Sequence, residues 1–274
     1  AALRMVTLSP ADYFGWRDRG AIAPGRRADL AAVDSLERCS VLKVWKNGRL
    51  TAENGRLTSG AVPRTAAPGV STGGIGVPNE KAFEIPVPAG SKIRVVGLRK
   101  GQVVTDHLIL EPPLSGGMAA ADPARDICRL AVLEKNQGTG RLALGFVHGL
   151  GLREGALGSS VAHDAHNFVA AGADIPSLRK ALAFLAAEGG GIVAVKGDRV
   201  LASLALPVGG LMNPASADTV IAGLEEAEKA AATLGTELEH PFMAMSFLSL
   251  SVIPELKLTD QGYVDLGRGG FQSL

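Results

Sequence analysis

One stretch near residue 60 argues against a single continuous fold for this chain of 274 residues. Residues 59–80 read SGAVPRTAAPGVSTGGIGVPNE, a segment rich in Gly, Pro, Ser and Thr with no apolar period. Such a segment buries no hydrophobic face and is typical of a linker. We therefore predict a helical start at residues 1–19, a small β unit at 20–60, a linker at 61–82 and a large mixed domain at 83–274.

The first 60 residues predict short helices followed by the β unit. Helical spacing over residues 3–7 is expected to stop at Ser9 and Pro10, which cap a second short helix over residues 11–14. Strands are expected at residues 28–33, 41–46 and 49–52, with Asn-Gly pairs at 47–48 and 54–55 as tight turns. The chain lacks an initiator Met and opens inside a helical pattern. We therefore expect that further residues precede it in the intact protein.

The larger domain is predicted to be α+β. Strands are expected at residues 93–98, 102–110, 127–134, 141–147, 157–162, 192–196 and 199–206. Two amphipathic helices are expected, one carrying Leu178 and Leu182 and ending at Gly189, the other beginning near Val220 and ending at Gly235. No strand–helix unit recurs eight times, so the chain is not itself a complete TIM barrel.

Composition excludes several classes of partner. Charged residues make up 20% of the chain and the net charge is only +1, with no basic run, which disfavours nucleic acid and membrane surfaces. No apolar stretch is long enough for a membrane helix, and no signal peptide is recognisable. Cys39 and Cys128 match no metal-binding spacing, so we expect both to be buried free thiols in a reducing cytoplasm.

The densest group of chemically active side chains lies at residues 159–167. It comprises Ser159, Ser160, His163, Asp164, His166 and Asn167. If the chain turns after Ala162, the two histidines can converge as they would at i and i+3 of a helix, whereas on a continuous strand they point to opposite faces. Three interpretations stay open: a loop that orients a substrate or acts as a lid, a polar network that fixes a corner, and a zinc site that needs a further ligand from elsewhere.

Other polar and sulfur-containing residues receive simpler interpretations. His107, His148 and His240 are isolated in the sequence, and Arg153 with Glu154 is expected to form a local ion pair. Core packing is expected for Met243, Met245, Phe247 and Leu248. Asp122, Arg125 and Asp126 are expected to begin an element and to do nothing more.

Three landmarks in the first 50 residues resemble amidohydrolases. Residues 20–30, GAIAPGRRADL, resemble the passage that follows the eighth barrel helix and begins the return leg of a small β-sandwich. In this passage Gly25 permits a tight turn and Asp29 can bond nearby backbone amides. Residues 7–11 match the end of the last barrel helix, and residues 44–49 match the terminal hairpin.

The remainder is similar to the C-terminal domain of adenine deaminases within that superfamily. The resemblance rests on GFVHGLGLREGALGSSVAHDAHN at 145–167, on GGLM at 209–212 and on PFMAMSFLSLSVIPELKLTDQG at 241–262. Residues 135–140, KNQGTG, depart from the pattern, since a histidine or two is expected there in relatives.

The resemblance implies an enzyme of purine metabolism, a hydrolase that converts adenine to hypoxanthine and ammonia with a metal-bound hydroxide. It implies two divalent ions (manganese, iron or zinc) per active site in the intact enzyme. This chain has no His-x-His motif and is expected to bind no metal by itself. The expected partners are the missing N-terminal barrel half, adenine and a second copy in a homodimer, in the cytoplasm. The alternative is a non-catalytic ligand-binding or regulatory domain.

Overall fold

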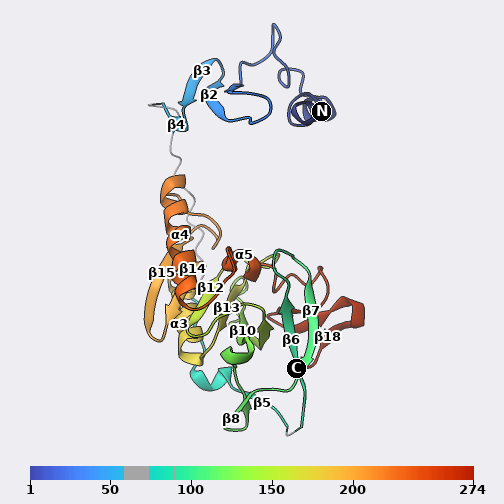
Figure 1. Cartoon of the computed structure of the whole chain (residues 1–274), viewed down its shortest axis with the longest axis vertical. Helices are drawn as coiled ribbons and strands as arrows, with labels where there is room; N and C mark the ends of the chain where they lie inside the picture. Colours follow the sequence, from blue (N-terminus) through green and yellow to red (C-terminus); the bar gives the residue numbers. More distant parts are fainter. Residues whose placement is uncertain (59–73, 89) are drawn as a thin grey trace. The chain divides into compact units, whose positions relative to one another are not determined.

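The computed structural model describes residues 1–58, 74–88 and 90–274. The chain divides into two compact units, Ala1–Ala66 and Ala67–Leu274 (Figure 1). Most of the predicted linker, residues 61–73, lies outside the described residues. Its end holds a 3-10 helix that the sequence did not predict, η1 (Glu80–Phe83), which begins where the Asn79 side chain accepts a hydrogen bond from the Ala82 amide.

The first unit contains two short helices and a four-stranded antiparallel sheet. The helices are α1 (Ala2–Met5) and α2 (Leu8–Tyr13). The strands follow in the order β1 (Leu30–Val33), β2 (Val41–Lys46), β3 (Arg49–Glu53) and β4 (Arg56–Leu57). The expected break at Ser9 and Pro10 is wrong, because both lie inside α2. Since the first N–H groups of a helix have no intrahelical acceptor, proline is tolerated in the first turn.

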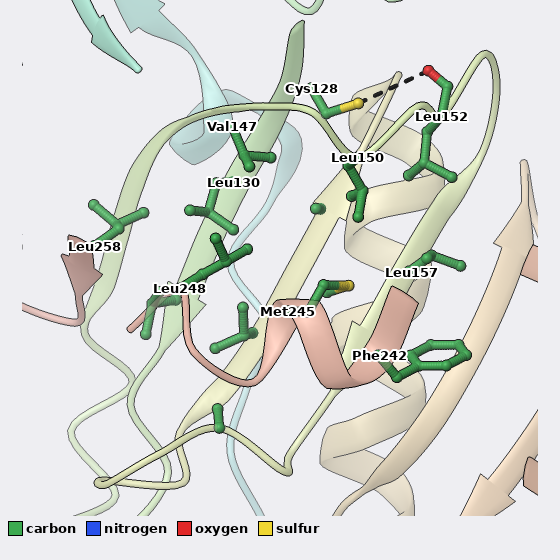
Figure 2. Packing of buried hydrophobic residues seen from close by; sticks show 14 of the residues in the cluster. Cys128, Leu130, Val147, Leu150, Leu152, Leu157, Phe242, Met245, Leu248 and Leu258 are labelled. Carbon is green, nitrogen blue, oxygen red and sulfur yellow. Dashed lines mark hydrogen bonds between the residues drawn. The ribbon is translucent and has the colours of Figure 1, made fainter. Parts of the chain in front are cut away.

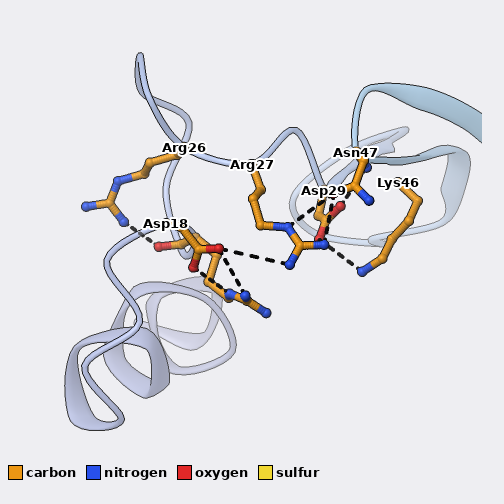
Figure 3. Close-up of polar contacts among 7 residues, drawn as sticks. Asp18, Arg26, Arg27, Asp29, Lys46 and Asn47 are labelled. Atoms are coloured by element: carbon orange, nitrogen blue, oxygen red, sulfur yellow. Dashed lines mark hydrogen bonds and ion pairs between the residues drawn. The ribbon is translucent and has the colours of Figure 1, made fainter.

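The turn before β1 follows the expectation for Asp29 (Figure 3). Asp29 accepts a hydrogen bond from the Asn47 amide at 2.7 Å and from Lys46 Nζ at 3.0 Å. The Asn47 amide and the Lys46 ammonium hold the pKa of this carboxyl below its usual range. Arg27 also lies 3.4 Å from Asp29 and bonds the Asn47 side chain. This carboxylate therefore ties the start of β1 to the β2–β3 hairpin.

The first unit exposes much of its apolar surface. Among its described residues only Ala11 is a buried hydrophobic residue. Eleven large apolar side chains of the unit are at least 40% exposed: Leu3, Met5, Val6, Tyr13, Phe14, Trp16, Ile22, Leu36, Val41, Leu42 and Leu57. A small sheet with so little buried apolar area gains little stability from packing of its own.

The second unit is built on an eight-stranded sheet with the order β15-β14-β12-β13-β10-β11-β6-β7. In chain order its strands are β6 (Ile93–Leu98), β7 (Thr105–Leu110), β10 (Ile127–Leu133), β11 (Leu142–His148), β12 (Ala156–Ser159), β13 (Phe168–Gly172), β14 (Gly191–Lys196) and β15 (Arg199–Ala205). Neighbouring strands are antiparallel except β11 and β6, which are parallel. No sheet of the described residues closes into a barrel.

Two small three-stranded sheets flank this large one. The first has the order β16-β17-β18, with β16 (Lys257–Thr259), β17 (Gly262–Asp265) and β18 (Gly270–Gln272). The second has the order β5-β9-β8, with β5 (Ile85–Pro86), β8 (Leu114–Ser115) and β9 (Met118–Ala119). Two 3-10 helices, η2 (Pro123–Arg125) and η3 (Leu266–Arg268), precede β10 and β18.

Successive side chains of β10 point alternately into two hydrophobic clusters, one on each face of the large sheet. Leu130 and Val132 belong to one cluster, whereas Ala131 and Leu133 belong to the other. All seven residues of β10 are buried, as expected of a central strand covered on both faces. Helix α3 (Ile175–Glu188) covers one face, and α4 (Ala217–Thr233) with α5 (Pro241–Met245) covers the other (Figure 1).

The two long helices end where the sequence predicted, and each begins at a side-chain cap that was not predicted. Asp174 caps α3 by accepting a hydrogen bond from the Ser177 amide at 2.7 Å, and Gly189 ends it with φ of 73°. Ser216 caps α4, which ends at Thr233 just before Gly235. A tight turn at Gly197 and Asp198 joins β14 to β15, between the two strands expected at 192–196 and 199–206. No helix of the described residues is long and apolar enough to span a membrane.

The larger core packs α5 and the following loop against the sheet (Figure 2). Met245 and Leu248 are fully buried there, as expected, but Met243 is 59% exposed, so its predicted core position is wrong. Cys128 is buried, and burial raises its pKa to about 12. Cys39 is exposed, contrary to expectation, because it sits in a surface turn with φ of 54°.

One tyrosine joins the small sheet to the large one. The Tyr263 hydroxyl accepts a hydrogen bond from the Phe146 amide at 2.7 Å and donates to the Arg94 carbonyl at 2.8 Å. Phe146 lies on β11 and Arg94 on β6, and the backbone ladder between these two strands begins only beyond both residues. A Cβ on Gly145 would come within 2.4 Å of the Tyr263 oxygen, so glycine leaves the room that the phenol occupies.

Several strands differ from the predictions. The strand expected at 157–162 ends at Ser159, and the strand expected at 102–110 begins at Thr105. Strand β13 and the β16–β18 sheet were not predicted. The β13 sequence, FVAAG, is rich in Ala and Gly, whose strand propensity is low, and burial between β10 and β12 is what extends it.

Candidate functional site

The residues singled out at 159–167 form a turn that leaves the large sheet after β12 and returns as β13. The chain turns at residues 163–165. The His163 amide donates to the Ser246 carbonyl at 2.9 Å, and the His166 amide donates back to the Ala162 carbonyl at 2.7 Å. Ser249 Oγ donates to the His163 carbonyl at 3.3 Å. The turn is therefore fixed against the loop after α5, and we call residues 160–167 the polar turn.

The two histidines of the polar turn converge, as the sequence spacing suggested for a chain that turns after Ala162. Their ring centroids lie 5.4 Å apart with an interplanar angle of 72°. The Phe247 ring lies 5.2 Å from the His163 ring. Both imidazoles are partly exposed, and Asp164 between them is exposed. The pair can thus meet a ligand while an aromatic ring supports one side.

His166 is held in the neutral form. Burial lowers its pKa, and the nearby His163 and Lys135 lower it further, whereas Asp164 opposes the effect. Because the ordinary histidine pKa is about 6.5, a lowered value leaves this imidazole uncharged at neutral pH. Its Nδ1 atom is buried and has no hydrogen-bond partner among the described residues. A neutral imidazole with an unsatisfied buried nitrogen is suited to bonding a buried water molecule, or a heterocycle once the ring rotates toward it.

Asn167 anchors the end of the polar turn to two other loops. Its Oδ1 accepts hydrogen bonds from the Lys135 amide and from Asn136 Nδ2, each at 3.3 Å. Its Nδ2 donates to Asp260 Oδ1 at 3.3 Å, and Asp260 also pairs with Arg141. Asn136 Nδ2 lies 2.5 Å from the Ala165 carbonyl as well. The side chain at 136 therefore shapes the polar turn, although it lies in the segment 135–140 that departs from the family pattern.

Lys135 is a second residue that sequence reasoning missed. It is only 4% exposed, and burial lowers the pKa of its ammonium. Nζ donates to the Gly209 carbonyl at 2.9 Å and lies 5.9 Å from the Phe168 ring centre. No carboxylate forms an ion pair with it in the described part of the chain. The available signal was the mostly apolar run of β10, which ends two residues before this lysine, since a side chain so close to a buried strand is hard to return to solvent.

Ser159 and Ser160 make contacts of a different kind. Ser160 is fully buried, and its Oγ donates to the Gly210 carbonyl at 2.5 Å and accepts from the Gly191 amide at 2.7 Å. Ser159 Oγ accepts from the Val161 amide at 3.0 Å. These hydroxyls bond backbone groups, while the contacts of the histidines lie further along the polar turn.

A cavity of about 400 Å³ adjoins the polar turn. Asp164, Ala165 and Asn167 line one side, and Ser249, Ser251 and Asp260 contribute further polar groups. Val264, Leu266 and Phe271 supply apolar walls. The described residues contain no group of three or more His, Cys, Asp or Glu side chains that could hold a metal ion. What the described residues of the polar turn offer to a ligand is therefore hydrogen bonding.

Three other titratable residues that the sequence singled out take structural partners. His107, interpreted as isolated, is buried with its Nδ1 2.5 Å from Asp265 Oδ2, and His240 Nδ1 lies 2.9 Å from Glu228. Glu154 pairs with Lys196 at 2.6 Å across the β12–β14 edge, so the predicted pair with its chain neighbour is wrong.

Asp126 was expected only to begin an element, and this too is a correction. It adopts a left-handed conformation after η2, and its carboxylate faces the loop between β11 and β12. The carboxylate accepts hydrogen bonds from the amides of Gly149 and Gly151. Asp122 does begin an element, since its side chain caps η2.

Two family models match the chain. Residues 102–269 match the adenine deaminase C-terminal domain, and residues 1–51 match the amidohydrolase family. A protein of Oleidesulfovibrio alaskensis named adenine deaminase is 42% identical over 97% of this chain and 45% of its own length. Proteins of the same name from Desulfatibacillum aliphaticivorans and Methanothrix thermoacetophila are 41% and 39% identical, over 100% and 98% of the chain. The chain spans about half the length of these relatives.

Proposed function

Since the chain belongs to the adenine deaminase family, we propose that the intact protein hydrolyses adenine to hypoxanthine and ammonia. Water adds at C6 of the purine and the exocyclic amine leaves as ammonia, so one water molecule is consumed for each ammonia released. The support is a family model over residues 102–269 and relatives about 40% identical along nearly the whole chain.

The catalytic metal belongs, in this proposal, to the half of the intact enzyme that the relatives have and this chain does not. The amidohydrolase relationship suggests a divalent metal in the intact enzyme, and manganese, iron and zinc are the candidates. The described residues of this chain supply no cluster of ligands for it. We therefore expect the chain alone to be inactive toward adenine.

We assign to the polar turn the task of contacting adenine at the mouth of the barrel. The observation that carries this assignment is the pairing of His163 with His166, whose buried Nδ1 lacks a partner in the described structure. A purine ring offers several acceptor nitrogens and N–H donors, and a neutral imidazole can donate to one and accept from another. Asn167, held by Asn136 and Asp260, is a positioning residue in this scheme.

The first unit supports the proposed partnership with the missing half. Its β2 strand exposes Val41 by 50% and Leu42 by 43%, and its helices expose Met5 and Tyr13 still more. Burying such side chains contributes roughly 1.5–3 kcal/mol each. We propose that the N-terminal half of the intact enzyme covers them. Assembly as a homodimer and location in the cytoplasm complete the proposal, the latter supported by two cysteines that form no disulfide.

The test is a pair of alanine variants in the intact enzyme. His163→Ala and His166→Ala are expected to lower kcat/KM for adenine by about ten- to a hundredfold, the worth of one hydrogen bond made in the transition state. Thermal stability should change little. His148→Ala is the matched control, since that imidazole is half-buried on β11 outside the polar turn. Normal kinetics with a clearly lowered Tm would show instead that the two histidines only fix a corner.

A further inference from the structure

A second cavity, of about 310 Å³, lies between the β6–β7 turn and α5. Its walls are apolar and comprise Leu98, Val103, Leu238, Met243, Ala244 and Phe247. Met243 is 59% exposed and Val103 is 41% exposed. Neither side chain belongs to a hydrophobic core cluster of the described residues. Met243, which the sequence predicted to be in the core, therefore lines this cavity instead.

The rim of this cavity carries charges of both signs, and Lys100 is the cation there that no described carboxylate holds. Arg99 is paired with Asp106, and His240 is paired with Glu228. Glu239 lies 3.9 Å from the His240 ring. Lys100 is exposed and forms no ion pair within the described residues. The left-handed Gly101, with φ of 71°, closes the turn that presents this lysine at the rim.

The size and lining favour a small molecule over a protein partner. Small-molecule sites commonly hold about 300–1,000 Å³ and combine apolar and aromatic walls with a few polar groups. A thioether and an aromatic ring, as in Met243 and Phe247, both make favourable contacts with a flat ring. The single uncommitted ammonium selects for an anion at one end of that ring.

We propose that this cavity binds a small planar aromatic anion, with its ring between Met243 and Phe247 and its carboxylate or phosphate at Lys100. Phe247 also contacts the His163 ring on the polar turn, at 5.2 Å between centroids. The carbonyl of Ser246, next to Phe247, accepts the His163 amide. A ligand that moves Phe247 therefore moves His163, and the cavity is an effector site one ring away from the polar turn. The binding step does not depend on the proposed deamination.

The test of binding is an NMR titration of the full chain with naphthalene-2-carboxylate. For naphthalene-2-carboxylate a Kd of about 1 mM is expected from its size. The neutral 2-naphthamide should bind about tenfold more weakly. Lys100→Glu should weaken the carboxylate about tenfold. Lys92→Glu is the matched control, because Lys92 is an exposed lysine just before β6 whereas Lys100 follows that strand.

A second pair of variants tests the apolar wall. Met243→Asp should weaken the carboxylate at least tenfold, whereas Met212→Asp, at a methionine that is 61% exposed elsewhere, should leave binding unchanged. No binding at about 10 mM overturns the proposal. So does binding that neither Lys100→Glu nor Met243→Asp weakens, because the probe then sits on another apolar surface, such as that of the first unit.

The coupling to the polar turn has its own readout. Saturation with naphthalene-2-carboxylate should shift the His163 imidazole C–H resonance and leave that of His148 in place. Phe247→Leu should keep the binding but reduce the His163 shift at least twofold. A bound ligand with an unmoved His163 resonance would show that the cavity is a binding site without an effector role. Because each measurement uses the chain without catalysis, failure here is distinct from failure of the proposed deaminase activity.

Discussion

Replacing Tyr263 with phenylalanine removes one oxygen from the junction of three strands. That hydroxyl accepts from the Phe146 amide on β11 and donates to the Arg94 carbonyl on β6, and the side chain is 2% exposed. Burial also raises the pKa of the phenol, so the hydroxyl keeps its proton throughout the working pH range. The phenylalanine ring fills the same space beside Gly145. The variant therefore tests the hydrogen bonds and leaves the packing nearly unchanged.

The expected loss is about 2–3 kcal/mol of unfolding free energy. The Phe146 N–H is buried, and a buried donor left unsatisfied costs about 1–3 kcal/mol, while the partly exposed Arg94 carbonyl adds less. For a unit of this size each kcal/mol lowers Tm by about 2–4 °C, so the expected fall is about 4–12 °C. Urea unfolding followed by far-ultraviolet circular dichroism measures the free energy, and calorimetry measures Tm.

Tyr13→Phe is the matched control, since Tyr13 is 84% exposed. It should change the unfolding free energy by less than about 0.5 kcal/mol. A Tyr263→Phe loss within that same range would refute the reasoning, because it would mean that the two backbone groups find other partners at no cost. The variant also bears on the polar turn, since Tyr263 and Asp260 belong to the same β16–β17 hairpin.

Three further predictions concern a helix cap, a buried lysine and the exposed first sheet. Asp174→Ala should remove about 1 kcal/mol by deleting the cap of α3, whereas Asp198→Ala in a surface turn should not, as measured by urea unfolding. Burial lowers the pKa of Lys257 to about 8 from 10.5, so between these values the unfolded chain holds a proton that the folded chain has released, and stability rises with pH. Lys257→Met should abolish that rise in the urea midpoint. In the chain alone, hydrogen exchange of the β1–β4 amides should be fast, and association with the N-terminal half of a relative should slow it; full protection in a monomer would contradict this.

Much of the fold followed from local signals. The two long helices end near Gly189 and Gly235, where the apolar period stops and glycine permits the left-handed turn or the break. The Asn-Gly pairs at 47–48 and 54–55 form the turns of the first sheet, because asparagine and glycine tolerate the positive φ that such turns require. The density of polar residues at 159–167 was likewise visible as composition.

Other features had no local signal. Strand β13 has a sequence of low strand propensity. It forms because its backbone pairs with β10 on one side and with β12 on the other. Cys39 and Met243 lie in apolar stretches and yet are exposed, since burial depends on what packs over a segment and not on its neighbours in sequence. Asn136 lies where relatives are expected to carry a histidine, and only the structure shows that its amide bonds both Ala165 and Asn167.

The sequence by itself determined the family, the α+β character and the place where the polar residues gather, because these depend on residue type, spacing and resemblance along the chain. Only the tertiary structure decided that His163 faces His166 and Phe247, that Lys135 is buried beside them, and that Asp260 holds Asn167 from nearly a hundred residues away. The physical reason is that the environment of a titratable group, and hence its pKa and its free hydrogen-bonding capacity, is set by the side chains that long-range packing brings around it.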